Sequence, residues 1–179
     1  ETVASFPANV LAAQAGQMRC LVELGRMAEA ATAAEKVAAN SDANADLKGE
    51  ANLVAAKGLL EKGDDDAAFT KFKSVSTNSS NALGAEAKYY MAYIRHLQAK
   101  YRDAEKEVFD LAKKYPAYEH WKARAFILLG DIYVQLDDRF QAKATLQAVI
   151  DNCTEPDLVA QARQRLDVIN ASEVQQTAP

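Results

Sequence analysis

The sequence has few of the residues that break helices and form turns. Of its 179 residues only seven are glycine and four are proline, and aromatic residues make up 8%. An all-β sandwich or barrel needs many glycine- and proline-rich turns, together with abundant β-branched and aromatic residues. The composition therefore excludes that class of fold. The two cysteines are too few to indicate a redox compartment.

The net charge is small, and long apolar runs are lacking. The net charge is −4 and the isoelectric point is about 5.3, so the chain offers no basic stripe for a nucleic acid. No uninterrupted apolar run approaches the roughly 18 residues of a membrane-spanning helix, so no transmembrane segment is predicted. Disorder is also disfavoured, because a modest net charge is combined with a hydrophobic fraction of 49%.

Alanine is what the chain has in excess, with 36 of the 179 residues. Alanine is the strongest helix former, and four alanines recur at separations of 38, 36 and 38 residues. The positions four and seven residues after each of them are mostly large and apolar, which places them on one helical face. The recurring alanines are Ala30, Ala68, Ala104 and Ala142.

Each repeat predicts two helices joined by a short turn that is rich in glycine or aspartate. Twelve residues before the recurring alanines lie Met18, Ala56, Ala92 and Gly130, mostly small residues that suit a close crossing of two helices. The predicted helices span residues 8–24 and 27–39, 45–62 and 64–78, 82–99 and 101–114, and 118–136 and 138–152, with a ninth at 156–171.

This pattern resembles the tetratricopeptide repeat family. The fourth unit carries Phe126, Leu129-Gly130, Tyr133 and Ala142 where that family has an aromatic residue, Leu-Gly, Tyr and Ala. The third unit matches through Met91-Ala92, Tyr101, Ala104, Val108 and Tyr115-Pro116. The resemblance implies an all-α fold, namely a right-handed superhelical solenoid of about four helix-turn-helix hairpins.

The implied hairpins lie at about 8–40, 45–80, 82–116 and 118–153, and a capping helix at 156–171 follows them. Residues 1–171 would then form a single repeat domain, with a polar tail at 172–179. Ser5-Phe6-Pro7 resembles the end of another repeat, so we expect the chain to be a C-terminal portion of a longer protein.

Nothing in the sequence predicts catalysis, a cofactor or a metal site. His96 and His120 lack metal-ligand spacing with the cysteines, and no phosphate-binding loop or nucleophile elbow is present. The acidic run at 64–66 is interpreted as the cap of a helix N-terminus. Cys20 and Cys153 lie on the first and last hairpins, so we expect two separate, buried thiols.

The resemblance also implies that the first helix of each hairpin lines a concave groove for a protein or peptide segment. Tyr89, Tyr93 and His96 share a helical face, and the two tyrosines suit partner binding and packing between repeats equally well. Trp121 is expected to pack rather than to bind. The expected partner-binding residues are Arg19, Lys57, Glu86, Tyr89, Tyr93, His96, Arg124 and Asp131.

The function predicted from these features is a non-catalytic scaffold or adaptor that binds a protein or peptide in its groove. The alternative is a structural or oligomerisation segment of a larger multidomain or cell-envelope assembly protein, which includes a homo-oligomer. The loosely kept consensus is similar to that of bacterial cell-envelope tetratricopeptide proteins. That similarity implies a periplasmic or cell-envelope location, and a cytoplasmic one stays open.

Overall fold

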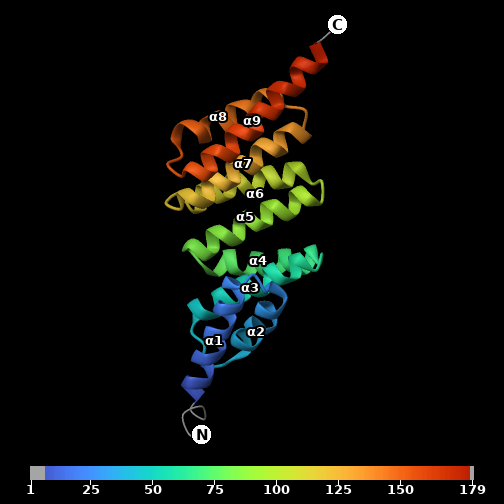
Figure 1. The fold of residues 1–179 in the computed structure, drawn as a ribbon. Helices are drawn as coiled ribbons and strands as arrows, with labels where there is room; N and C mark the ends of the chain where they lie inside the picture. Colours follow the sequence, from blue (N-terminus) through green and yellow to red (C-terminus); the bar gives the residue numbers. More distant parts are fainter. Residues whose placement is uncertain (1–6, 178–179) are drawn as a thin grey trace. The chain divides into compact units, whose positions relative to one another are not determined.

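The structure is a computed structural model that describes the backbone of residues 7–177 and the side chains of residues 9–172. This part of the chain is all-helical and contains no strand (Figure 1), which confirms the all-α prediction. The helices are α1 (Pro7–Glu23), α2 (Met27–Ala39), α3 (Ala45–Glu61), α4 (Asp65–Asn78), α5 (Ala82–Leu97), α6 (Tyr101–Lys114), α7 (Glu119–Gln135), α8 (Arg139–Asn152) and α9 (Pro156–Thr177).

The predicted helix ends agree with the structure to within two residues, except at the end of α9. That helix continues to Thr177, six residues beyond its predicted end at residue 171, whereas the polar tail at 172–179 stays a prediction. No glycine or proline occurs between Asp157 and Thr177, and the helix therefore meets no stop signal. Ser5 and Phe6, from which an upstream repeat was expected, lie outside the described residues.

The turns between the two helices of each predicted hairpin share one backbone conformation and one hydrogen bond. Gly25, Gly63, Ala99 and Asp137 all adopt positive φ, at 69°, 78°, 55° and 58°. In each case the next amide donates back to a carbonyl five residues earlier, as from Asp64 N to Leu59 O at 3.0 Å. This is the hydrogen bond of a Schellman helix end, and it recurs with the repeat of the sequence.

Side chains cap the start of several helices. The Asp64 carboxylate accepts a hydrogen bond from the Ala67 amide at 3.2 Å, which confirms that the acidic run caps α4. The Asn44 side chain accepts from the Leu47 amide at 2.9 Å and caps α3 in the same way. These bonds satisfy amides that have no partner inside the helix.

The chain divides into two compact units, residues 1–87 and 88–179, so that α5 begins in the first and ends in the second. In the first unit, α1 packs against α2, α2 against α3, and α3 against α4 (Figure 1). Its core includes Met18, Ala30, Val37 and Ala51, which are fully buried. The single repeat domain expected over 1–171 stays a prediction.

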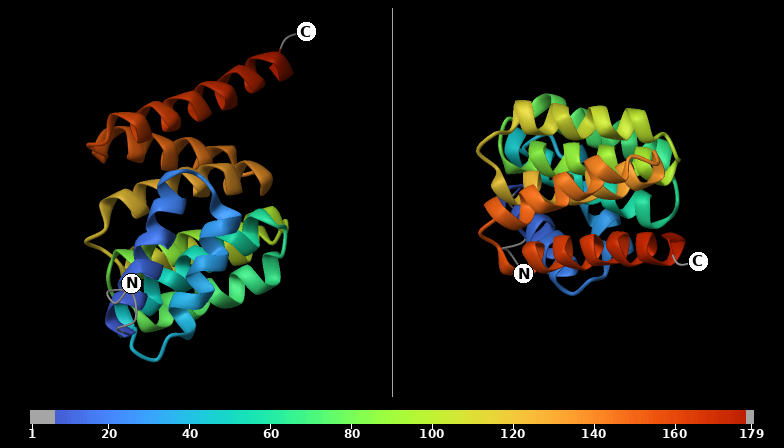
Figure 2. Two further views of the ribbon diagram at one scale, coloured as in Figure 1. Left: turned by 60° about the horizontal axis from the view of Figure 1, so that its bottom comes forward. Right: turned by 90° about the horizontal axis from the view of Figure 1, so that it is seen from above.

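In the second unit, α7 packs against α6, α8 and α9, and α8 also packs against α9 (Figure 2). Ala104 and Ala142 are fully buried in it, as Ala30 and Ala68 are in the first unit. Gly130 lies at a close crossing, where an added Cβ would come within 2.7 Å of the Leu146 Cγ. The small residue predicted at this position is therefore required by the approach of α8 to α7.

Both cysteines are free thiols. Cys153 is half-buried, whereas Cys20 is exposed, so the expectation that both are buried is wrong for Cys20. Cys20 lies on the outward side of α1, whose buried positions on either side of it are Met18 and Leu21. Within the described part of the chain, every helix is too short or too polar to cross a lipid bilayer.

Candidate functional site

Five of the predicted binding residues lie together in the second unit, on α5 and α7. They line a cavity of about 120 Å³ that α9 completes with Gln161 and Arg165. A larger hollow of about 540 Å³ also includes His96, Asp131 and Arg165 in its lining. We call the two hollows together the α5–α7–α9 groove. The predicted residues in it are Tyr89, Tyr93, His96, Arg124 and Asp131.

Aromatic side chains form one side of this groove. The Tyr89 and Tyr93 rings are stacked with centroids 6.4 Å apart, and the Tyr89 and Trp121 centroids are 5.6 Å apart. The Arg124 guanidinium carbon lies 4.6 Å from the Tyr89 centroid and 5.1 Å from that of Trp121. Tyr89 is only 9% exposed. Tyr89 and Trp121 therefore pack and hold Arg124 by cation–π interactions, while the half-buried Tyr93 stays open to a ligand.

The acidic residue of the groove is already paired. Arg165 Nε on α9 donates to both carboxylate oxygens of Asp131 on α7, at 3.0 and 2.9 Å. Both side chains are about one-third exposed, so an isolated pair of this kind is worth about 0.2–1 kcal/mol. A partner would meet the Asp131–Arg165 pair as a dipole rather than as a free negative charge.

Arg165 was not predicted, although the sequence contains a signal for it. Asp131 and Arg165 are 34 residues apart, as are Ile127 and Gln161, and this is close to the repeat length. Residues 156–171 are predicted to be a capping helix, so Gln161 and Arg165 are not among the predicted groove residues. Continuing the repeat for one more step would have placed Gln161 and Arg165 beside α7.

His96 contributes a polar atom with an unmet requirement. The ring lines both hollows, and its Nδ1 is buried without a hydrogen-bond partner among the described side chains. Leaving such an atom unpaired costs about 1–3 kcal/mol, so buried polar atoms nearly always have partners. The ring also lies 5.7 Å from that of Tyr101, centroid to centroid, which fixes its position at the edge of the groove.

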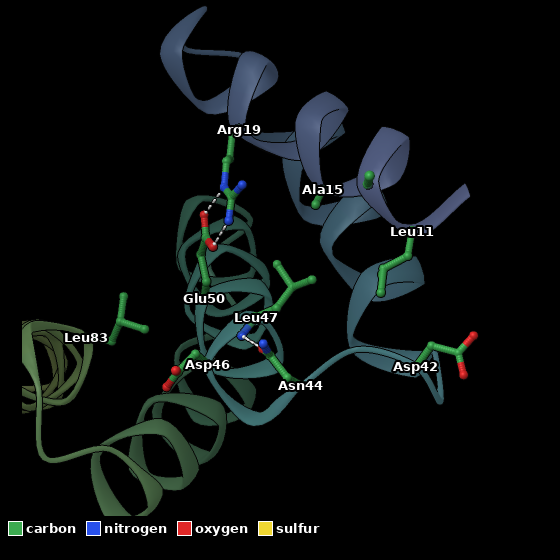
Figure 3. A pocket seen from close by; sticks show the side chains of 10 residues that line it. Leu11, Ala15, Arg19, Asp42, Asn44, Asp46, Leu47, Glu50 and Leu83 are labelled. Carbon is green, nitrogen blue, oxygen red and sulfur yellow. Dashed lines mark hydrogen bonds and ion pairs between the residues drawn. The ribbon is translucent and has the colours of Figure 1, made fainter. Parts of the chain in front are cut away.

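In the first unit, each charged residue that was predicted to bind a partner forms an ion pair within the protein. Arg19 on α1 forms two hydrogen bonds with Glu50 on α3, from Nε to Oε1 at 2.7 Å and from Nη2 to Oε2 at 2.6 Å (Figure 3). These bonds, and then the charge of Glu50, raise the pKa of Arg19 above its usual value. Lys57 on α3 forms an ion pair with Glu86 on α5. Lys57 and Glu86 thus link two helices, and neither belongs to the lining of a groove described here.

A second groove opens beside the Arg19–Glu50 pair. It has a volume of about 890 Å³ and lies mainly between α1 and α3, with one residue from α5 (Figure 3). We call it the α1–α3 groove. Of the predicted binding residues, Arg19 alone lines it. Five of the eight therefore line the α5–α7–α9 groove and one lines the α1–α3 groove, whereas Lys57 and Glu86 line neither. Its lining residues are Leu11, Ala12, Ala15, Arg19, Asp42, Asn44, Asp46, Leu47, Glu50 and Leu83.

Comparison with known proteins adds no family to these observations. No protein-family model matches the chain, and no curated protein matches it. The resemblance to tetratricopeptide repeats therefore stays a prediction, and the functional proposal depends on the geometry of the grooves.

Proposed function

We propose that the protein is a non-catalytic scaffold that binds a segment of another protein in the α5–α7–α9 groove. The proposal includes the finer architecture, in which tetratricopeptide-like hairpins stack into a right-handed superhelical solenoid and α5, α7 and α9 line its concave face. Localisation to the periplasm or cell envelope is part of the same proposal and rests on the resemblance alone.

The groove that the His96 ring lines, where the buried Nδ1 has no partner among the described residues, is the observation that carries this proposal. The other walls of this groove supply an aromatic ring at Tyr93, amides at Gln161 and Gln164, and apolar surface at Val134. The lining thus mixes polar side chains with aromatic and apolar ones, and a concave site with convergent polar groups is typical of ligand binding. A peptide carries both backbone groups that can hydrogen-bond with the polar side chains of the groove and side chains that can fill the hollows.

The two hollows also differ in a way that suits successive side chains. The smaller one is lined mostly by charged, polar and aromatic residues, including Arg124, with Ile127 and Leu128 as its aliphatic residues. The larger one adds Val134, Val168 and Ile169. A segment lying along the groove would place a polar or acidic group near Arg124 and an apolar group near Val168. The exposed Val168, with 64% of its surface accessible, is then explained as a contact for the partner.

A selection experiment followed by a blocking substitution tests the proposal. Peptides are first selected from a random library on the immobilised protein, and their affinities are measured by fluorescence anisotropy. Gln164→Trp places a large ring in the groove and should weaken the selected peptides at least tenfold. Gln147→Trp is the matched control, because Gln147 is an exposed residue of α8 outside the groove. Equal affinities for the two variants would refute binding in the α5–α7–α9 groove.

The oligomerisation alternative makes a different prediction for the same variants. If the chain serves to associate with itself, sedimentation velocity should detect dimers whose fraction rises with protein concentration. The Gln164→Trp variant tests whether such dimers use the groove. Dimers that persist in this variant, together with the absence of any selected peptide, would favour the alternative over groove binding.

A further inference from the structure

The α1–α3 groove combines an apolar floor with an acidic rim. Half of its lining residues are leucine or alanine, and Leu11 and Leu47 are half-buried side chains that extend into the space between the two helices (Figure 3). Ala15, which also lines the groove, is buried. Apolar surface of this kind is unfavourable in water and is stabilised when another apolar side chain covers it.

The charges around this floor are unbalanced. Three carboxylates, Asp42, Asp46 and Glu50, line the groove together with a single cation, Arg19. The Arg19 guanidinium donates two hydrogen bonds to the Glu50 carboxylate, so these two charges neutralise each other. Asp42 and Asp46 are exposed, and neither forms an ion pair with any other described side chain. The rim therefore keeps two negative charges that a ligand can neutralise.

We infer that the α1–α3 groove binds a protein segment in which a lysine or arginine side chain lies next to a leucine-like apolar side chain. The apolar side chain covers Leu11 and Leu47, and the cation faces Asp42 or Asp46, which lie on opposite sides of these two leucines (Figure 3). This inference rests on the proposed function of the protein as a scaffold for peptide segments, and it assigns a ligand chemistry to a groove in the other unit.

Charge and geometry together exclude other occupants. A nucleic acid or an acidic peptide would be repelled by the carboxylates of the rim. A metal ion does not fit, because no three His, Cys, Asp or Glu side chains in the described part of the chain are grouped to hold one. An amine or guanidinium on a flexible aliphatic stem suits the site, since the stem can lie along the apolar floor.

The experiment uses the full chain and a defined probe, a fluorescein-labelled peptide of alternating leucine and lysine residues whose binding is followed by anisotropy. Two further peptides replace either all lysines by glutamate or all leucines by serine. The leucine–lysine peptide should bind, and both replacements should weaken binding at least tenfold. Equal binding of the serine peptide, or of the glutamate peptide, would overturn the inference.

A pair of matched variants separates the groove from general attraction to an acidic protein. Asp42→Asn with Asp46→Asn should weaken the leucine–lysine peptide about tenfold, as expected for the loss of two partly exposed ion pairs. Glu35→Gln with Asp103→Asn removes the same charge from exposed sites on α2 and α6. Asp103 also matches Asp46 in lying in the first turn of its helix. This control should bind like the unmodified protein, and equal weakening of the two variants would overturn the inference.

A failure of the inference about the α1–α3 groove can be distinguished from a failure of the proposed scaffold function. Gln164→Trp lies in the second unit and should leave binding of the leucine–lysine peptide unchanged. If the library-selected peptides respond to Gln164→Trp while the leucine–lysine peptide does not bind, the scaffold function stands and the inference about the α1–α3 groove is refuted.

Discussion

Gly58 lies where α3 crosses α2, and its lack of a side chain sets how closely the two helices approach. A Cβ added at Gly58 would overlap the Cβ of Ala31, with the Met27 carbonyl oxygen 3.6 Å and the Ala31 Cα 3.7 Å away. Carbon atoms in contact stay about 3.5–4.0 Å apart, and a Cβ cannot move without its backbone. Gly58→Ala therefore forces α2 and α3 apart.

The expected change in stability is a difference of two terms. Overpacking of a buried contact costs about 1–3 kcal/mol, whereas replacing glycine by alanine inside a helix returns about 0.5–1 kcal/mol. We expect Gly58→Ala to lower the free energy of unfolding by about 1–2 kcal/mol. Gly16, inside α1, has nothing within 4 Å of an added Cβ. Gly16→Ala should therefore raise the free energy of unfolding by about 0.5–1 kcal/mol.

Urea denaturation followed by circular dichroism measures both variants. A double-mutant cycle with Ala31→Gly then identifies the cause, because that change removes the atom that the new Cβ would overlap. In the Ala31→Gly background, Gly58→Ala should become stabilising. The same loss of stability in both backgrounds, or a stabilising effect of Gly58→Ala in the unmodified protein, would refute this explanation of the helix crossing.

Two other substitutions and one double-mutant cycle have predictable effects on stability. Burial and a hydrogen bond to Glu105 raise the pKa of Tyr133 to about 12, so its stabilising contribution is complete below pH ~10, where the unfolded phenol begins to ionise. That contribution is lost as the pH rises to about 12, and Tyr133→Phe should remove this part of the alkaline loss, at most about 2–3 kcal/mol, in urea titrations. Asn44→Ala removes the cap of α3 and should cost about 1 kcal/mol, seen as a lower Tm. A double-mutant cycle on Asp131 and Arg165 in urea should give a coupling energy no larger than about 1 kcal/mol.

The positions of the helices could be predicted because they depend on local signals that recur. The residues at positive φ, such as Gly25 and Asp137, come five positions before the recurring alanines, and each ends a helix in the same way. The burial of Ala30 and Ala142 follows from the same periodicity. The end of α9 was missed because its last turns contain no stop signal, and the structure continues the helix through them.

The grooves were only partly predictable because they depend on contacts between helices about one repeat apart. Periodicity placed Tyr93 and His96 on one helical face, and the family resemblance added Asp131, but neither revealed that Arg165 pairs with Asp131. Nor did they indicate that Arg19 is bound to Glu50, since the meeting of two long side chains depends on how their helices cross. Asp42, which contributes to the rim of the α1–α3 groove, lies in a loop that has no helical period.

The location of the bound segment is the most direct test of groove binding. Amide chemical shifts of the labelled protein, recorded while a library-selected peptide is added, report which helices it contacts. The largest changes are predicted on α5, α7 and α9, around Tyr93, His96 and Arg165. Changes concentrated instead on α6 and α8, where Phe109 and Phe140 are exposed, would contradict binding in the α5–α7–α9 groove.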